Sequence, residues 1–477
     1  MKNSLGTDHF VHLRIINYLK SNKEYFLKDV FTFDERYCFY PFLFHWLISK
    51  LPNRAIHGEG YKKINLVIRI LRIFLFNFFC IQFGLVDDLL KGLLLNIVYL
   101  TFPFSYLKWN AINSGLSARG FGLLLGEAYL YLIYGYFIYD YYPFYLILCV
   151  FGIFFYLSSQ FSTQFFILSN LFFTIYFSDL VFILIPIISG ILYYLMFKRV
   201  AISYFYGQFN HKRNYVLFFL KTQFKHRKSF YRDFIYDFWI KFKKTPKQGI
   251  RYFFTNPFIE ISYGYLYLIL YLILKPLSFN NLSNLEIIVF SGVFCFVLTT
   301  FSYTRFLGEA QRYIQFTMPF IAIGFVNLFS VGFILSVIVT SIIIIILYYT
   351  LNFTYEKSSK QIDFVKWFLE VKNLLETNDL IISNDTQLIK IFSANFQIIS
   401  TDWTYFFKDK KEFQFNHPKN YSILSPEAIN YLNKKYKPSI LVINCKLYNQ
   451  EEKEYIIKNC TLKEITEFSN YKMYRFV

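Results

Sequence analysis

The residues with the clearest chemical potential lie at the start of the chain, in GTDHFVHLRIINYL, residues 6–19. Asp8 stands beside His9, and helical spacing puts Asp8 and His12 on one face, four positions apart. A carboxylate at this point could accept the proton of an attacking hydroxyl group, if burial or a nearby charge tuned its pKa. The pattern also suits a helix start, because Thr7 or Asp8 could cap the first amide groups. Asp8 is therefore predicted to be either a general base or an N-cap.

Two further stretches contribute candidate residues. FDERY contains Asp34 and Glu35, and YPFLFHWLISKLP, residues 40–52, contains His45. His45 follows an apolar helical run, so the sequence predicts either a packed core histidine or a residue that supports a nearby site.

The composition determines what kind of elements must position these residues. Of 477 residues, 55% are hydrophobic and only 17% are charged, against about 25% charged in soluble domains. Apolar stretches such as 182–197 and 333–351 approach the roughly 20 residues that cross a bilayer as a helix. The sequence therefore predicts an integral membrane protein. Its net charge of +19 favours anionic lipid headgroups or phosphate-bearing substrates, and without a soluble basic domain it does not indicate nucleic acid.

Hydrophobicity divides the chain into three zones: an extracytoplasmic or interfacial loop over residues 1–62, a helical membrane domain over 63–351 and a soluble domain over 352–477. We expect about ten spans, near 64–84, 89–105, 120–140, 143–157, 164–178, 179–197, 258–275, 285–302, 317–330 and 331–351. An even number of spans would put the N-terminal loop and the C-terminal domain on the same side of the membrane.

A strongly basic loop, residues 198–256, separates the sixth and seventh predicted spans. It holds 14 lysines and arginines against two aspartates, with aromatic residues between them. This pattern is typical of a helix that lies in the headgroup plane. The positive-inside tendency would place the loop in the cytoplasm, whereas the even number of spans places it beside the N-terminal loop. The sequence therefore leaves open whether this loop lies in the cytoplasm or on the same side as the N-terminal loop.

From about residue 355 the sequence turns polar, and helical and strand patterns alternate. DLIISND, FQIIS, SILVINC and YKMYRFV suggest strands, and SPEAINYLNKKYK suggests a helix with a serine cap. This alternation predicts a small α/β domain. Cys445 and Cys460 could pair there or remain two unrelated thiols. The six cysteines show no metal-binding spacing.

Ionisable residues also occur in or beside the predicted spans. Glu127 in GLLLGEAYLYL is notable, because a charge within a span is costly and normally faces a cavity or a partner. Arg119 precedes it by eight positions, too far for a direct pair. Arg312 follows Glu309 by three positions, so these two residues could pair. Arg119 and Arg312 could also have no role in a site and serve only to anchor their helices at the membrane interface.

The order of these phrases resembles the GT-C superfamily of membrane-embedded glycosyltransferases, the class that includes protein mannosyltransferases and aminoarabinose transferases. That family carries a GxDxxxH phrase in its first non-cytoplasmic loop, matched here by Gly6, Asp8 and His12. A YPPLLHxLLxxLP phrase follows, matched by Tyr40, Pro41, His45 and Pro52. SGLSARGFGLLLGEAYL and FLGEAQRYIQFTMPF add to the likeness, which extends loosely over about 350 residues.

The resemblance implies an inverting transfer of a sugar from a polyprenyl-phosphate donor to a lipid, glycan or protein acceptor of the cell envelope. Asp8 would be the base, with His12, Glu35 and His45 in support. Arg119 and Arg312 would bind the donor phosphate as charge develops on it. The family normally has a span before its first loop, so we expect either a further N-terminal helix or a topology that differs from that of the family. Phe42 replaces the second proline of the family phrase, and Asp87 with Asp88 is an alternative second acidic position.

We expect a multi-pass protein of a bacterial inner membrane, surrounded by membrane lipids. Its active site would face the extracytoplasmic side. The residues do not indicate any particular cofactor. Carboxylates that could bind a divalent cation are present, but no spacing among them indicates a metal site. The alternatives are a polysaccharide polymerase or ligase, or a flippase or transporter of lipid-linked sugars.

Overall fold

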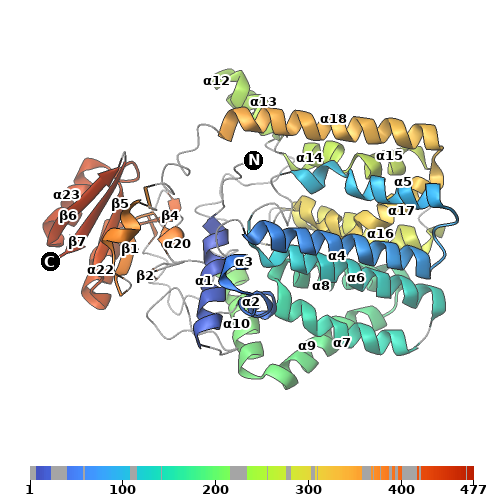
Figure 1. Ribbon diagram of the computed structural model, residues 1–477, viewed down its shortest axis with the longest axis horizontal. Coiled ribbons are helices and arrows are strands. Elements are labelled where there is room, and N and C mark those ends of the chain that lie inside the picture. The colour runs from blue at the N-terminus through green and yellow to red at the C-terminus, as the bar shows by residue number, and fades with distance from the viewer. Residues whose placement is uncertain are drawn as a thin grey trace. The chain divides into compact units, whose positions relative to one another are not determined.

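The computed structural model (Figure 1) divides into two compact units. It describes residues 7–22, 40–56, 60–107, 115–140, 142–214, 234–254, 256–275, 281–301, 304, 307–308, 310–356, 367–368, 370–376, 378–385, 389–392, 396–399, 416–417, 420–468 and 470–477. The first unit combines Met1–Ile56, Arg199–His226 and Glu356–Val477, and the second combines His57–Lys198 and Arg227–Tyr355. Each unit therefore joins segments that are far apart in the sequence.

The second unit is built from helices. They are α4 (Gly60–Gln82), α5 (Leu89–Leu100), η1 (Pro103–Tyr106), α6 (Ala118–Tyr139), α7 (Tyr142–Ser158), α8 (Gln160–Phe177), α9 (Val181–Phe197), α12 (Phe234–Lys244), α13 (Pro246–Phe254), α14 (Pro257–Gly264), α15 (Leu266–Leu274), α16 (Asn284–Thr300), η6 (Ala310–Thr317), α17 (Met318–Leu328) and α18 (Val331–Glu356). Helices α4 and α6 pack against each other, and α18 runs in roughly the same direction across the view in Figure 1.

Three of these helices are long and apolar enough to cross a membrane: Gly60–Gln82, Ala118–Tyr139 and Val331–Thr350. Four shorter apolar helices accompany them, at Leu89–Leu100, Tyr142–Ser158, Val181–Phe197 and Asn284–Thr300. The predicted helical character and the presence of helices suited to a bilayer are confirmed. The number of ten spans stays a prediction.

Three predicted spans differ from the continuous helices expected. The span predicted at 89–105 consists of α5 followed by a turn and the 3₁₀ helix η1. The span predicted at 258–275 breaks at Tyr265, whose backbone leaves the helical region and separates α14 from α15. The Tyr265 hydroxyl donates to the carbonyl oxygen of Gln311 at 2.7 Å, and its ring stacks on Phe104. These contacts hold the break in place. The span predicted at 317–330 is only the short helix α17, which follows the 3₁₀ helix η6.

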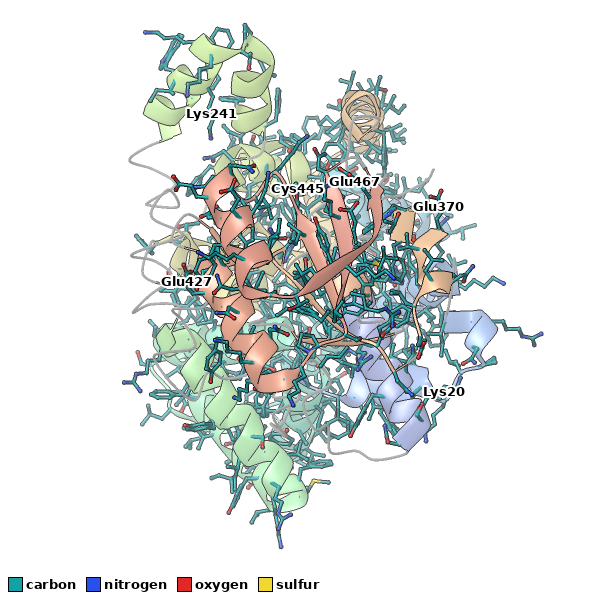
Figure 2. All side chains as sticks on the ribbon, turned by 90° about the vertical axis from the view of Figure 1, so that its left-hand side faces the viewer. Lys20, Lys241, Glu370, Glu427, Cys445 and Glu467 are labelled. Carbon is teal, nitrogen blue, oxygen red and sulfur yellow. The ribbon has the colours of Figure 1, made fainter. Side chains whose placement is uncertain are left out.

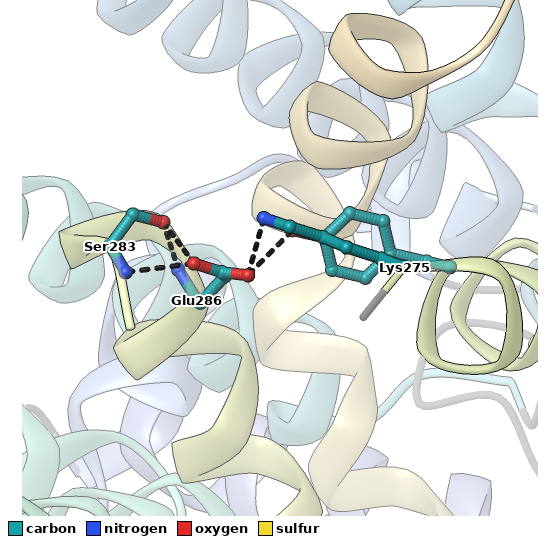
Figure 3. A network of polar contacts seen from close by, with 4 residues as sticks. Lys275, Ser283 and Glu286 are labelled. Carbon is teal, nitrogen blue, oxygen red and sulfur yellow. Dashed lines mark hydrogen bonds and ion pairs between the residues drawn. The ribbon is translucent and has the colours of Figure 1, made fainter. Parts of the chain in front are cut away.

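Helix α16 shows how local sequence sets a helix start. Ser283 and Glu286 form a capping box: the Ser283 hydroxyl accepts from the Glu286 amide, and the Glu286 carboxylate accepts from the Ser283 amide at 2.7 Å. Lys275, at the end of α15, donates to the same carboxylate at 2.5 Å (Figure 3). One acidic residue therefore caps α16 and ties it to α15.

Close packing between α6, α8 and η6 forms part of the core. Phe316 of η6 stacks on Phe165 of α8 with ring centroids 3.9 Å apart. A β-carbon at Gly126 of α6 would collide with the Phe316 ring. The absence of a side chain at Gly126 is what lets the two elements approach this closely.

The first unit contains four described helices outside the C-terminal domain: α1 (Thr7–Asn22), α2 (Leu43–Ser49), α3 (Asn53–Ile56) and α10 (Arg199–Asn214). The zone predicted as an interfacial loop thus holds short helices. In the basic loop, α10, α12 and α13 are helical, and residues 215–233 lie outside the described part.

The C-terminal domain is α/β, as predicted. Its described elements are η7 (Lys372–Leu374), β1 (Leu380–Ser383), α20 (Ile389–Phe392), β2 (Gln397–Ile399), β3 (Asn416–His417), β4 (Asn420–Leu424), α22 (Pro426–Tyr436), β5 (Ile440–Asn444), α23 (Gln450–Asn459), β6 (Leu462–Phe468) and β7 (Tyr471–Phe476). The main sheet has the order β2-β1-β5-β7-β6. The pairs β1–β2 and β1–β5 are parallel, whereas β5–β7 and β6–β7 are antiparallel.

The sheet and its helices enclose a small apolar core. Ile382, Ile429 and Leu441 are fully buried in it. Ser425 caps α22 by accepting from the Ala428 amide, as the sequence predicted. Figure 2 shows this domain, with Cys445 just after β5. Cys445 and Cys460 are both free thiols, so the alternative of a disulfide between them is wrong.

Candidate functional site

Two histidines from the two sequence phrases meet in the first unit. His12 lies on α1 and His45 on α2, and both side chains are buried. His12 Nδ1 and His45 Nε2 are 2.8 Å apart, a hydrogen-bonding distance. Tyr40 packs edge-on against both imidazole rings, with centroids 5.5 Å away in each case. The structure therefore joins GxDxxxH and YPFLFH through a direct side-chain contact.

A second contact fixes where the protons of this histidine pair lie. His45 Nδ1 is 3.2 Å from the carbonyl oxygen of Pro41, which can only accept, so Nδ1 of His45 carries the proton. In the neutral ring Nε2 of His45 is then an acceptor, and His12 Nδ1–H donates to it. The remaining nitrogen of a neutral His12, Nε2, is consequently an acceptor too.

Burial favours the neutral form of His45. The pKa of His45 lies well below its ordinary value of 6.5, chiefly because burial removes its imidazole from water and secondly because a charge on His12 would repel it. The hydrogen bond to Pro41 opposes this shift without reversing it. His45 therefore stays uncharged at neutral pH, a state in which its ring can orient other groups through hydrogen bonds.

Helix α1 is held at its middle and near its C-terminal end by contacts within the first unit. Arg14 donates to the carbonyl oxygen of Phe396 at 2.6 Å, which connects α1 to the C-terminal domain. Lys20 donates to the carbonyl oxygen of Leu51 at 2.8 Å and to the side chain of Asn53 at 2.6 Å. Basic side chains on α1 thus fix the helix that carries His12.

The acidic candidates are described only in part. Asp8 is in the first turn of α1, one turn before His12, as its predicted spacing requires, and its side chain lies outside the described part. Asp34 and Glu35 also lie outside the described residues. Asp88 caps α5 by accepting from the Lys91 amide, and Asp87 pairs with Lys91 at 2.6 Å, so these two aspartates mark a helix start.

The two predicted phosphate-binding arginines lie in the second unit. Arg119 is in the first turn of α6, two residues after the N-cap Ser117, and is half-buried. Arg312 is half-buried in η6, an element that packs against α6. The pairing predicted for Arg312 involves Glu309, which lies outside the described residues.

Glu127 has a partner that the sequence reasoning missed. Its carboxylate accepts from Arg72 of α4 through two atoms, Nε at 2.8 Å and Nη2 at 2.6 Å. The Tyr99 hydroxyl of α5 donates to the same carboxylate at 3.0 Å. All three side chains are at least nine-tenths buried. This cluster joins three helices by a bidentate ion pair.

A signal for this pair was present in the sequence. Arg72 lies inside the apolar stretch predicted as the first span, just as Glu127 lies inside the third. Opposite charges in two apolar spans are expected to pair, because each is costly to bury alone. Spacing along a single helix offers only Arg119, which is too far from Glu127 to pair with it.

A second polar cluster surrounds the break between α14 and α15. The Gln311 side chain donates to Glu260 at 2.8 Å, and both residues are buried. Glu260, Arg312 and Arg72 all lie close enough to the Tyr265 hydroxyl to act on it electrostatically. The cluster therefore brings Arg312 and Arg72 to the same polar region of the second unit.

The described residues contain no group of three or more histidine, cysteine, aspartate or glutamate side chains placed to hold a metal ion. Neither known protein families nor curated proteins match this chain in sequence. The likeness to GT-C glycosyltransferases therefore depends on the short phrases alone.

Proposed function

We propose that this protein is a membrane glycosyltransferase that moves a sugar from a polyprenyl-phosphate donor to a cell-envelope acceptor. The observation that carries the proposal is the hydrogen bond between His12 and His45. His12 and His45 belong to the two phrases that resemble GT-C enzymes, and they are 33 residues apart in the chain. A buried contact between them is what we expect if the two phrases form one site.

In the proposed reaction, Asp8 is the general base. The acceptor hydroxyl attacks the anomeric carbon of the sugar, and the carboxylate of Asp8 takes its proton. The bond between the anomeric carbon and the phosphate oxygen breaks, and its electron pair goes to the polyprenyl phosphate. Asp8 precedes His12 by one helical turn, so the histidine pair would orient groups beside the carboxylate.

Cations are needed where the leaving phosphate gains charge. Arg119 at the start of α6 and Arg312 in η6 are the proposed donor-phosphate ligands, and the packing of α6 against η6 supports their cooperation. Glu35 is proposed to assist at the acceptor.

Two features of the first unit support a single active side. Residues of α1 contact the C-terminal domain, so both belong on one side of any membrane that the chain crosses. Helix α10, from the basic loop, belongs to the same unit. Both observations favour an even number of spans, with this part of the loop on the same side of the membrane as α1, the side proposed to carry the active site.

The decisive test replaces Asp8 with Asn, which retains size and hydrogen-bonding capacity but removes the base. We expect sugar transfer in proteoliposomes to fall by at least 100-fold, in line with the roughly 10²–10⁴-fold contribution of a general base. The measurement uses a radiolabelled polyprenyl-phosphate sugar, with extracted envelope material as acceptor.

Asp87→Asn is the matched control, because Asp87 is an exposed aspartate that pairs only with the neighbouring Lys91 among the described contacts. This variant should transfer sugar at the wild-type rate. Full activity of Asp8→Asn, with an unchanged melting temperature, would exclude Asp8 as the base.

One observation favours the second candidate, a flippase or transporter of lipid-linked sugars. Transporters build their binding sites from discontinuous helices, and α14 and α15 form such a broken pair beside the Glu260–Gln311 cluster. Movement of a fluorescent polyprenyl-phosphate sugar across vesicles without acceptor would support transport. Glycosylated product without such movement would support the transferase.

A further inference from the structure

Part of the basic loop forms a helical hairpin in the second unit. Helices α12 and α13 are separated only by Thr245. Gly249 of α13 lies so close to the backbone of Phe242 in α12 that a β-carbon at Gly249 would collide with it. One turn further from the bend, the rings of Phe238 and Phe253 contact each other with centroids 5.7 Å apart. The two helices therefore pack against each other in antiparallel directions.

The hairpin is too short to cross a bilayer, but it belongs to the unit that contains the candidate spans. Its helices have 11 and 9 residues, which gives lengths of about 17 Å and 14 Å against a hydrocarbon core of about 30 Å. In Figure 1 the hairpin lies at the left-hand end of the long helices, level with the C-terminal end of α18. The Tyr263 hydroxyl of α14 donates to the carbonyl oxygen of Phe254 at 2.8 Å, which attaches the hairpin to this unit. The hairpin is therefore placed where the surface of a bilayer would meet the end of a span.

Four side chains share one face of the hairpin, named here the Trp239 face. Each residue of a helix is turned by about 100° from the one before it, so in two antiparallel helices the residues that directly follow the facing positions lie on the same side. Trp239 and Lys243 directly follow the facing residues of α12, and Ile250 and Phe254 directly follow those of α13. The three apolar side chains are 53%, 49% and 47% exposed, and Lys243 is exposed. The Trp239 face is thus an apolar surface with a lysine at its edge.

The charge of the hairpin indicates what this face contacts. Residues 234–254 contain five lysines and arginines against one aspartate, a net charge of +4. Lys243 on the Trp239 face and Lys244, which turns away from it, are both exposed. Anionic headgroups attract such a basic segment, and aromatic rings are favoured between the headgroups and the acyl chains. The charge and the apolar face therefore fit the same partner, an anionic bilayer surface.

We propose that the α12–α13 hairpin inserts its Trp239 face into the headgroup layer of an anionic bilayer leaflet. The side chains of Trp239, Ile250 and Phe254 would reach the upper acyl chains, and Lys243 would extend to the phosphates. The insertion would hold this part of the basic loop at the membrane surface, level with the end of α18. It is independent of the proposed sugar transfer, because it uses none of the residues assigned to that reaction.

The test uses spin labels on the full-length protein in proteoliposomes of phosphatidylcholine and phosphatidylglycerol. Cys38 and Cys445 are first replaced by serine, because the other four cysteines are buried. Collisions with oxygen and with a water-soluble nickel complex then give the depth of each label. We expect the label at Ile250→Cys to lie about 5–10 Å below the phosphates. Lys244→Cys, on the far side of the hairpin, is the matched control, and its label should remain in water.

Charge variants test the choice of lipid. In vesicles of phosphatidylcholine alone, the label at Ile250→Cys should lie closer to water than in the anionic vesicles. Lys243→Gln combined with Lys244→Gln should give the same shallow position in anionic vesicles, because two of the cations that attract the headgroups are lost. Equal depths in all three cases would overturn the assignment to anionic lipid.

Tryptophan quenching provides a second measurement if a spin label disturbs the fold. Lipids brominated near the top of the acyl chains should quench the emission of the wild-type protein, and Trp239→Phe should lose a large part of this quenching. Trp367→Phe removes a tryptophan that is 2% exposed in the C-terminal domain and should retain the quenching. Equal quenching in the two variants would contradict insertion of the Trp239 face.

Two results of the labelling would overturn the proposal. If neither oxygen nor the nickel complex reaches the label at Ile250→Cys, protein covers the Trp239 face. If this label lies in water like the one at Lys244→Cys, the hairpin does not enter the bilayer. Asp8→Asn should leave both depths unchanged, so loss of sugar transfer and loss of insertion are independent results.

Discussion

The Arg72–Glu127 ion pair gives the sharpest prediction about stability, because its two members respond differently to loss of the partner. Glu127→Leu leaves a guanidinium buried among apolar helices, and arginine cannot lose its proton in a protein. Arg72→Leu leaves a carboxyl group that can become neutral by taking up a proton. We therefore expect Glu127→Leu to be the more damaging of the two single substitutions.

The magnitude follows from the contacts that are lost. Removal of one member of a buried pair costs about 3–5 kcal/mol, whereas a hydrogen bond between membrane helices contributes only about 0.6 kcal/mol on average. The stranded charge is thus the larger effect. We expect Glu127→Leu to lower the free energy of unfolding by about 3 kcal/mol and Arg72→Leu by less. The double variant should be more stable than Glu127→Leu alone, because no charge remains buried.

The assay is reversible unfolding in mixed micelles, followed by circular dichroism, with all four proteins compared at pH 7. Asp87→Asn provides the control, since this exposed pair with Lys91 should change stability by less than about 1 kcal/mol. Additive losses in the double variant would refute the reasoning, because they would show that neither charge depends on the other for its burial.

Two further predictions concern the histidine pair and the packing of α6. The folded protein lowers the pKa of His45 below 6.5, so the unfolded chain binds a proton at this residue more readily than the folded one does. The contribution of His45 to the free energy of unfolding is therefore fully present above pH 6.5. Below pH 6.5 the free energy of unfolding falls by up to about 1.4 kcal/mol per pH unit. His45→Gln should flatten this slope in melting curves from pH 5 to pH 8, and an unchanged slope would contradict it. Gly126→Ala should destabilise the protein by about 1–3 kcal/mol, because its new β-carbon collides with Phe316. Gly332→Ala, which meets nothing within 4 Å, should be neutral or slightly stabilising, and equal melting temperatures for the two variants would contradict the packing argument.

The sequence predicted most helices and the main strands well, because their signals are local. Apolar runs without strong breakers gave α4, α6 and α18, and alternating or continuous apolar residues gave β1 and β5. Helix ends followed the same rule where a cap was nearby, as Ser425 shows for α22. The antiparallel strand β6 was missed, because LKEITEF contains charged residues throughout and its apolar face is short.

The sequence also predicted that Asp8 and His12 share a helical face, and the structure forms that helix. The sequence did not predict the contact between His12 and His45, because these residues are 33 positions apart and no local pattern indicates how the two segments pack. Glu127 was singled out correctly as a charge in need of a partner, but the choice of Arg72 required knowledge of which helices are neighbours.

By itself, the sequence determined the apolar composition, the helices suited to a bilayer, the basic loop and the α/β character of the C-terminal domain. These properties depend on residues close together in the chain, where propensity and periodicity act. Only the tertiary structure decided that α1 shares a unit with the C-terminal domain, that α14 breaks from α15 at Tyr265, and that Arg72 of α4 pairs with Glu127 of α6. These features depend on packing and on pairing of charges across long stretches of chain, which no local pattern records.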